Sequence, residues 1–317
     1  MNRTLKDYLL ITLRGIAMGA ADVIPGVSGG TIAFITGIYQ ELLNSIKSVN
    51  LKSLKLLFSG KIAEFWTAIN GTFLISLLAG IGISILSLAK LLKYLLDHHP
   101  ILIWSFFFGL IVASAVYVAK DIKGWTPGTV VSLIVGAVIA WMITVITPAE
   151  PNTTYPFIFL SGAIAICAMI LPGISGSFIL VLMGMYQYIL GAVSNFNIPV
   201  IIVFLCGAGI GIVAFSNVLS WLLKKYYNQT IALLAGFMVG SLNKVWPWKQ
   251  VLDTFTNSHG ETVPLVEKNV LPGNYFALTG HDAQLGWAIA LAIFGFVLIF
   301  AIEGVAKRLQ KVEKAKF

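Results

Sequence analysis

Two short polar segments of the same kind interrupt apolar sequence, at residues 25–29 (PGVSG) and 172–176 (PGISG). Proline and glycine end a helix, and the serine that follows can cap the next helix. The first amides of a helix carry a partial positive charge and unpaired N–H groups, which together bind anions. Each segment therefore predicts an anion site at the start of a helix.

The two segments belong to a longer internal repeat. Residues 24–43 and 171–190 align without gaps, and nine of the twenty aligned positions are identical. The shared residues include proline, glycine, serine, tyrosine and glutamine, which chance similarity between apolar helices does not explain. The repeat predicts two copies of one unit, residues 1–147 and 148–317.

Two such tips meeting within a membrane could hold one phosphate group. A cap and tight packing would explain a single copy as well as a binding role does, but the duplication favours binding. The predicted phosphate-binding residues are Pro25, Gly26, Ser28, Gly29, Gly30 and Thr31 in the first copy, Pro172, Gly173, Ser175, Gly176 and Ser177 in the second, and Arg14.

Arg14 and Asp22 are ionisable residues in the apolar arm before the first tip. Intramembrane charges are costly and usually functional. Eight residues apart, they lie about 80° from one another around a helix. Asp22 could carry a proton or hold the loop by hydrogen bonds, and Glu41 could do the same. An ion pair, or an anchor at the membrane interface, is the alternative explanation.

A tyrosine and a glutamine recur at the same place in both copies, as Tyr39-Gln40 and Tyr186-Gln187. They could line the cavity between the tips. Hydrogen bonding between helices would explain them equally well.

The composition places these residues in a membrane protein. Charged residues make up 11% of the 317 residues and apolar residues 58%, whereas soluble domains have about 25% charged residues. This excludes a soluble enzyme and a nucleic-acid-binding module. The two cysteines and four histidines show no ligand spacing, so we expect neither a metal nor another cofactor.

The elements that must position the tips follow from the apolar runs. Runs of about 20 residues or more predict membrane helices near 64–96, 100–119, 127–147, 198–223, 230–247 and 284–306. Each tip lies between two shorter apolar arms, which predicts a re-entrant helical hairpin, although two complete spans remain possible. The predicted fold is an all-α polytopic membrane protein in which each unit has one hairpin and three transmembrane helices.

The distribution of basic residues predicts the orientation. With both termini in the cytoplasm, the basic clusters at 47–61, 120–123, 224–225 and 307–316 are cytoplasmic, and Lys90 and Lys93 are the exceptions. The segment at 250–283 is then outside. Each unit has an odd number of spans, so the second enters from the opposite side, as in the inverted repeats of secondary transporters.

The first copy resembles a known signature. Residues 18–31 read MGAADVIPGVSGGT and are followed by Gly37-Ile38-Tyr39. They resemble the motif of the bacterial polyprenyl-phosphate transporter family, long described as a domain of unknown function. The second copy, Leu171 to Tyr186, also fits the pattern, and the similarity covers nearly the whole chain. Met169 stands where the first copy has Asp22.

The resemblance implies transport of undecaprenyl phosphate, the lipid carrier of envelope glycans, from the outer to the cytoplasmic leaflet of the bacterial cell membrane. The lipid and the bilayer are then the partners, and no nucleic acid is involved. The family's motif maps onto Asp22 and the tip residues named above. Proton coupling through Asp22 would be asymmetric between the two copies.

Two other functions stay open from the sequence. Undecaprenyl-pyrophosphate phosphatases also pair inverted hairpins, but with an arginine in a Pro-Gly-x-Ser-Arg-Ser motif. Here Gly29 and Gly176 occupy that position, and the chain has no Glu-x-x-x-Glu. Phosphoryl transfer needs a cation and a positioned base or nucleophile, so we expect no enzyme. A carrier or channel for a small soluble anion is the third possibility.

Overall fold

The structure is a computed structural model that describes residues 3–22, 28–146, 152–256 and 262–314. The first half contains helices α1 (Leu5–Asp22), α2 (Gly29–Ile35), α3 (Tyr39–Ser48), α4 (Leu51–Phe58), α5 (Ile62–Ala68), α6 (Gly71–His98), α7 (Pro100–Lys120) and α8 (Pro127–Val145). The second half contains α9 (Tyr155–Ile170), α10 (Gly176–Leu182), α11 (Tyr186–Ser194), α12 (Ile198–Lys225), α13 (Tyr227–Ser241), β1 (Lys249–Thr256), β2 (Thr262–Asn269), α14 (Pro272–Thr279) and α15 (Leu285–Lys314).

The chain is mostly helical, as predicted. Within the described residues, three helices are long and apolar enough to cross a membrane (α7, α8 and α12), or up to five if each of two bent helix pairs is one span. Large apolar side chains are exposed, for example Leu86 at 83% and Trp287 at 72%. Exposed apolar surface of this extent is typical of a lipid-facing protein. Local signals set several helix starts, because Pro100 and Pro127 occupy first-turn positions and Thr126 caps α8.

Two expectations need correction. The run at 64–96 is two helices, α5 and α6, which are bent by 70°. The bend falls at Asn70, which has a left-handed backbone with φ 55°. The segment at 250–283, which had no predicted structure, contains an antiparallel hairpin of β1 and β2 followed by α14. This two-stranded sheet adds to the predicted all-α architecture.

The helices pack in four close pairs. In the first half α1 packs on α6, and in the second half α9 packs on α12. The other two pairs join the halves, because α7 packs on α15 and α8 packs on α13. In each pair the two backbones approach at reciprocal glycines, where an added Cβ would collide with a carbonyl of the facing helix: Gly15 and Gly80, Gly162 and Gly207, Gly109 and Gly295, and Gly136 and Gly236.

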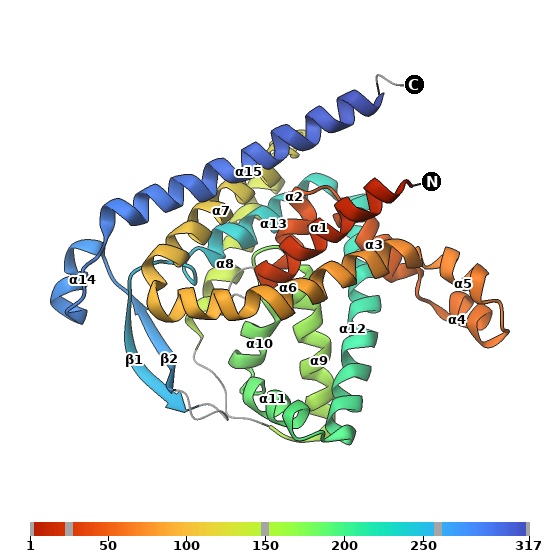
Figure 1. Ribbon diagram of the computed structural model, residues 1–317, viewed down its shortest axis with the longest axis horizontal. Coiled ribbons are helices and arrows are strands. Elements are labelled where there is room, and N and C mark those ends of the chain that lie inside the picture. The colour runs from red at the N-terminus through yellow and green to blue at the C-terminus, as the bar shows by residue number, and fades with distance from the viewer. Residues whose placement is uncertain (1–2, 23–27, 147–151, 257–261, 315–317) are drawn as a thin grey trace.

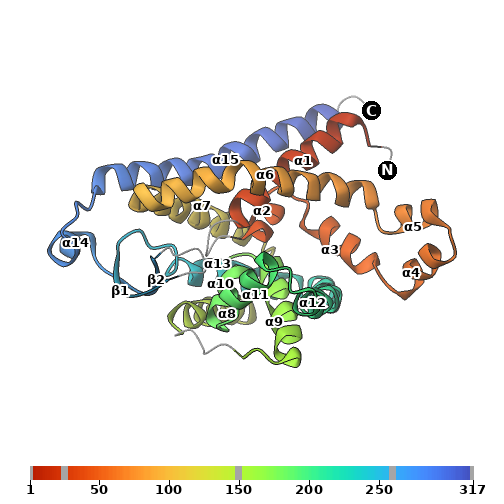
Figure 2. The ribbon, with the colours of Figure 1, turned by 60° about the horizontal axis from the view of Figure 1, so that its bottom comes forward.

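Figures 1 and 2 show how these pairs are arranged. Helices α1, α6, α7 and α15 lie along one side of the molecule, and α9 to α12 lie on the other. The hairpin of β1 and β2 with α14 is at one end, and α4 and α5 are at the opposite end (Figure 2). The beginning of α1 and the end of α15 also lie toward the end that carries α4 and α5.

Candidate functional site

The two repeated segments meet in the interior. The Ser28 hydroxyl lies 3.0 Å from the carbonyl oxygen of Met169 and 3.1 Å from that of Leu171, and can donate to either. In return the amide of Gly173 donates to the hydroxyl of Thr31 at 3.1 Å. Ser28 and Thr31 are 0% and 1% exposed. The start of α2 is therefore joined directly to the segment that precedes α10.

The first turn of α2 is satisfied by its own chain. The Gly29 amide donates to Asp22 Oδ1 at 2.7 Å, and the Gly30 amide donates to the Ser28 hydroxyl at 3.1 Å. The Thr31 amide donates to the carbonyl of Ser28 at 3.0 Å. All three amides that were predicted to face an anion thus already have acceptors. Of the first-copy residues, Pro25 and Gly26 lie outside the described residues.

Close approach explains two of the glycines in this turn. A Cβ on Gly29 would collide with the carboxylate of Asp22, and a Cβ on Gly30 would collide with the carbonyl of Ile170. Gly30 therefore lets the two repeated segments come this near to one another, and Gly29 leaves room for the Asp22 carboxylate.

The first turn of α10 is built differently. Ser175 stands at the N-cap without a side-chain capping bond, and its hydroxyl lies 2.8 Å from that of Ser177. The amides of Gly176 and Ser177 donate to no described residue. Ser175 is 3% exposed, so this turn presents buried hydroxyl and amide donors that have no capping acceptor within the described chain.

The loop before α10 is held against α13. Pro172 is buried, and Gly173 has a left-handed backbone with φ 87°. A Cβ on Gly173 would lie 2.9 Å from the Cα atom of Met238. The second tip is therefore held by the first tip on one side and by α13 on the other.

The recurring tyrosine and glutamine residues differ from one another in burial and in hydrogen bonding. Tyr39 is buried, and its hydroxyl donates to the carbonyl of Ile170 at 3.1 Å, which is a bond between the two copies. Gln40 is exposed and lines a pocket of about 90 Å³ between α3 and α12, with Asn44, Ser220 and Lys224. Tyr186 and Gln187 begin α11. The Gln187 Oε1 atom is buried without a hydrogen-bond partner among the described residues.

The remaining ionisable candidates lie apart from the tips. Glu41 accepts two hydrogen bonds of 2.6 Å from Arg3 and one of 2.8 Å from Asn70, so it joins the N-terminal segment to α3 and α6. Arg14 is half-buried and forms no ion pair or hydrogen bond with a described residue. It does not pair with Asp22, from which it is separated by about 12 Å of helix axis.

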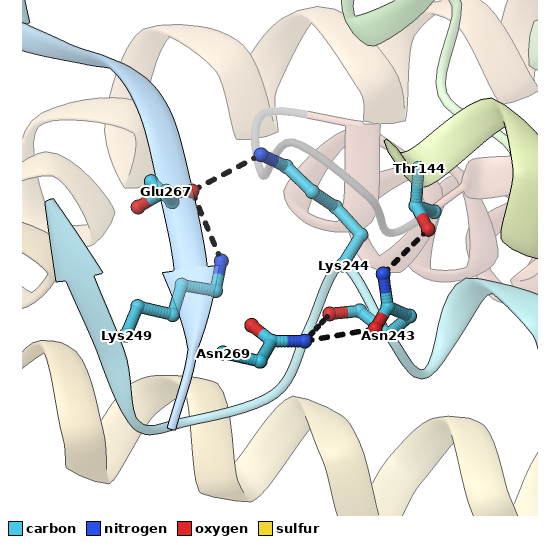
Figure 3. A network of polar contacts seen from close by, with 6 residues as sticks. All are labelled: Thr144, Asn243, Lys244, Lys249, Glu267 and Asn269. Carbon is cyan, nitrogen blue, oxygen red and sulfur yellow. Dashed lines mark hydrogen bonds and ion pairs between the residues drawn. The ribbon is translucent and has the colours of Figure 1, made fainter. Parts of the chain in front are cut away.

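Three charged residues near the second tip were not among the predicted site residues. Lys244 Nζ lies 3.1 Å and Lys249 Nζ 3.3 Å from the same oxygen of Glu267, as Figure 3 shows. Lys244 also lies 4.9 Å above the ring centroid of Phe178, in the first turn of α10. Lys249 lies 4.4 Å above the ring centroid of Trp104 in α7. Glutamate is scarce in this chain, so Glu267 stands out in the sequence, but nothing there indicates which lysines reach it.

Burial and mutual attraction set the charges of this group, which lies outside the membrane-spanning segments. Burial lowers the pKa of Lys249 to about 8, and the attraction of Glu267 offsets this only in part. Burial alone would raise the pKa of Glu267, but the two ammonium groups, Lys249 foremost, hold it below its usual value.

Comparison with known proteins gives matches that indicate the family of this chain. A family model described as undecaprenyl phosphate translocase-like matches residues 18–263. A protein of Vibrio cholerae serotype O1 named polyprenyl-phosphate transporter is 49% identical over 302 residues, which are 95% of this chain and 98% of that protein. A Staphylococcus aureus protein of the same name is 35% identical over 253 residues, 74% of this chain and 85% of that protein. No solved structure matches the chain.

These relatives are named as transporters, and together with the apolar helices they identify a multi-pass membrane protein. The matched residues include the first tip and extend through the second tip to the hairpin of β1 and β2. The chain belongs to the undecaprenyl phosphate translocase-like family.

Proposed function

We propose that this protein carries undecaprenyl phosphate from the outer to the cytoplasmic leaflet and binds the phosphate headgroup where the two tips meet. The relatives are named polyprenyl-phosphate transporters and the family is described as undecaprenyl phosphate translocase-like, which supports this lipid. The observation that carries the site is the direct contact between the two segments, made by Ser28 with the carbonyls of Met169 and Leu171 and by Thr31 with the amide of Gly173.

A phosphate headgroup needs such a site. An unpaired anion in hydrocarbon costs many kcal/mol, so the headgroup must travel through a protein-lined polar environment. The start of α10 offers the hydroxyls of Ser175 and Ser177, which are hydrogen-bonded to each other, and the amides of Gly176 and Ser177, which have no acceptor among the described residues. The prenyl tail can stay in the lipid phase throughout.

We propose that residues 1–147 and 148–317 are an inverted repeat within one integrated membrane domain. Two pairings support this: α1 on α6 corresponds to α9 on α12, and α7 on α15 corresponds to α13 on α8. The 113° bend between α10 and α11 supports a re-entrant hairpin in the second unit. Rocking of the units about the tips would expose the headgroup to each leaflet in turn.

The proposed orientation places both termini in the cytoplasm. The beginning of α1, the end of α15 and the basic helix α4 lie toward one end of the molecule, whereas the hairpin of β1 and β2 lies at the other (Figure 1). Basic residues concentrate on the cytoplasmic side of membrane proteins. The hairpin is then on the outer face, where the lipid would enter.

Asp22 has two possible roles in this scheme. Its hydrogen bond to the Gly29 amide supports loop holding, because the carboxylate caps α2 from outside the turn. We propose loop holding as its primary role and proton coupling as a role that a transport assay can detect. Glu41, bound by Arg3 and Asn70, serves to anchor α3.

Hydrolysis is not part of the proposal. Gly29 and Gly176 leave the tips without the arginine of the phosphatase motif. Within the described residues, no three histidine, cysteine or carboxylate side chains lie together as a metal site. The relatives are named transporters rather than enzymes.

A proteoliposome assay tests this function. Inward movement of labelled undecaprenyl phosphate is compared between wild type, Ser175→Ala/Ser177→Ala and Lys268→Ala, the last being a control in exposed sequence. We expect transport by wild type and the control and loss of transport in the serine variant. Unchanged transport in the serine variant would refute the tip site, and release of inorganic phosphate from the pyrophosphorylated lipid would favour the enzyme instead.

A further inference from the structure

Two ammonium groups share a single carboxylate beside the second tip. Lys244 and Lys249 both contact the same Oε2 atom of Glu267 (Figure 3). Two positive charges against one negative charge leave a net charge of +1 on the group. An unbalanced charge in a poorly hydrated place is costly, and a protein usually retains it for function.

The fold fixes this group firmly. Lys249 pairs with Asn269 across the hairpin, and Val251 pairs with Glu267, so Lys249 and Glu267 are diagonal neighbours on one face of the sheet. Asn243 donates to the Thr144 hydroxyl at 2.7 Å, and the Asn269 side chain donates to the carbonyl of Asn243 at 2.7 Å. These bonds join the hairpin to the ends of α8 and α13.

The two lysines differ in how far their side chains are exposed and in how closely they are tied to Glu267. The Lys249 side chain is 7% exposed and lies against Trp104, so it is committed to Glu267. The Lys244 side chain is 23% exposed and lies over Phe178, one residue after Ser177. Because Lys249 can neutralise Glu267 without help, Lys244 can leave the carboxylate for another anion without stranding a buried charge.

The position of Lys244 is suited to such an exchange. It follows α13 by three residues, and Met238 of α13 is the residue against which Gly173 of the second tip packs. The same helix therefore supports the tip and leads to the lysine. Phe178, which the Lys244 ammonium overlies, directly follows Gly176 and Ser177, whose amides have no acceptor in the described chain.

We propose that Lys244 is an anion-receiving residue that exchanges Glu267 for the dianionic phosphomonoester of an incoming lipid, beside Ser175 and Ser177. The inference rests on the proposed function. A phosphomonoester suits the site because a single ammonium adds a strong charge-assisted bond to the amide and hydroxyl donors of the tip. The shared chemistry is a phosphate dianion, either on a lipid or as inorganic phosphate.

Binding to the purified full chain in nanodiscs tests this. Three ligands are titrated: undecaprenyl phosphate, undecaprenol, which lacks the phosphate, and inorganic phosphate. We expect Lys244→Ala to weaken binding of undecaprenyl phosphate by about tenfold or more. Lys244→Arg should bind almost as wild type, and Lys268→Ala, a change on the exposed face of the same hairpin, should bind as wild type. The response to inorganic phosphate alone shows whether the lipid tail is needed.

The variant Lys244→Met separates phosphate binding from a purely structural role of Lys244. Methionine keeps an apolar side chain over Phe178, and Lys249 still neutralises Glu267. We expect this variant to melt near the wild-type temperature and to lose phosphate affinity. Wild-type affinity in this variant or in Lys244→Ala would overturn the inference and leave Lys244 only as an ion-pair partner of Glu267. If wild-type protein bound undecaprenol as tightly as the phosphate, the proposed function would fail together with it.

Discussion

The two tips share a sequence but not a state of hydrogen bonding. At the first tip, Asp22 and Ser28 occupy the amides of Gly29 and Gly30, so the start of α2 is closed by the protein itself. At the second tip, Met169 replaces the aspartate and Ser175 makes no capping bond. The start of α10 keeps its donors, with Lys244 close by.

The difference shows how two copies of one motif can take different roles, one structural and one in binding. The first tip acts as a clamp, because Ser28, Thr31 and Tyr39 all bond to the main chain of residues 169–173. The clamp orders the loop that leads into α10. The exchange of Asp22 for Met169 removes the carboxylate acceptor at the start of α10, which supports the proposal that the second tip receives the ligand.

The largest expected effect tests the packing of the second tip. Gly173→Ala should lower the free energy of unfolding by about 3 kcal/mol, since it forces a Cβ into a left-handed backbone and against Met238. Gly37→Ala is the matched control, because Gly37 has φ 74° with no atom within 4 Å of an added Cβ. It should cost about 1 kcal/mol. Thermal unfolding in detergent measures both. Equal losses of stability in the two variants would contradict the close packing of Gly173 against Met238.

Serine substitutions test the division of labour directly. Ser28→Ala should lower stability by about 1–2 kcal/mol, because it removes the hydroxyl that donates to the carbonyl of Met169 or Leu171 and accepts from the Gly30 amide. The affinity of the folded variant for phosphate should change little. Ser175→Ala/Ser177→Ala should do the reverse, with about tenfold weaker lipid binding and unchanged melting. Equal loss of lipid affinity in both variants would contradict different roles for the two tips.

Substitutions of Asp22 distinguish between two roles of this residue, holding the loop and carrying a proton. Asp22→Asn keeps an acceptor for the Gly29 amide, so transport should continue at a rate close to wild type. Asp22→Ala removes the acceptor and should cost about 1 kcal/mol of stability and much of the transport. The readout is transport into liposomes with and without a pH gradient. If Asp22→Asn transported the lipid but no longer responded to the gradient, Asp22 would be the proton carrier.

The smallest effect concerns the charge beside the second tip. The pKa of Lys249 is lowered to about 8, so above that pH the group of two lysines and Glu267 loses its net positive charge. Phosphate binding should weaken by about twofold to fivefold as pH rises through 8, while the phosphomonoester stays doubly charged. Lys249→Met should remove this step in a titration of affinity against pH. A step that persists in Lys249→Met would assign it to another residue.

The same shift has a consequence for stability, with the opposite sign. Between about pH 8 and the usual value of 10.5, the unfolded chain still holds the Lys249 proton and the folded protein does not. Stability therefore rises with pH across this window as far as Lys249 alone is concerned. Comparison of melting curves of wild type and Lys249→Met isolates this contribution.

The positions of the long helices could be predicted from sequence because uninterrupted apolar runs define them. The run predicted at 100–119 is α7 at Pro100–Lys120, and the run predicted at 284–306 begins one residue before α15 at Leu285–Lys314. The break at Asn70 was missed, since a single left-handed asparagine leaves no mark on hydropathy. The hairpin of β1 and β2 was missed because exposed Val251 and Leu252 interrupt the alternation of a strand.

The meeting of the tips follows from the repeat, and the structure brings Ser28, Thr31 and the 171–175 loop together. The lysine pair could not be found in this way. Lys244 and Glu267 are 23 residues apart, and Lys244 lies in the segment before β1, so only the packing of that segment on the hairpin brings them together. Asymmetry between the tips was visible as Met169 opposite Asp22, but which amides are satisfied depends on side-chain geometry.

The crossed packing of the halves has a consequence for how the molecule is assembled. Because α7 closes on α15 and α8 closes on α13, the first half alone cannot cover the glycine faces of α7 and α8, and the second half alone cannot cover those of α13 and α15. A polypeptide cut within residues 147–151 would leave two fragments with mutually complementary surfaces. Co-expressed fragments should therefore find each other in the bilayer, and each fragment made by itself should be degraded or self-associate.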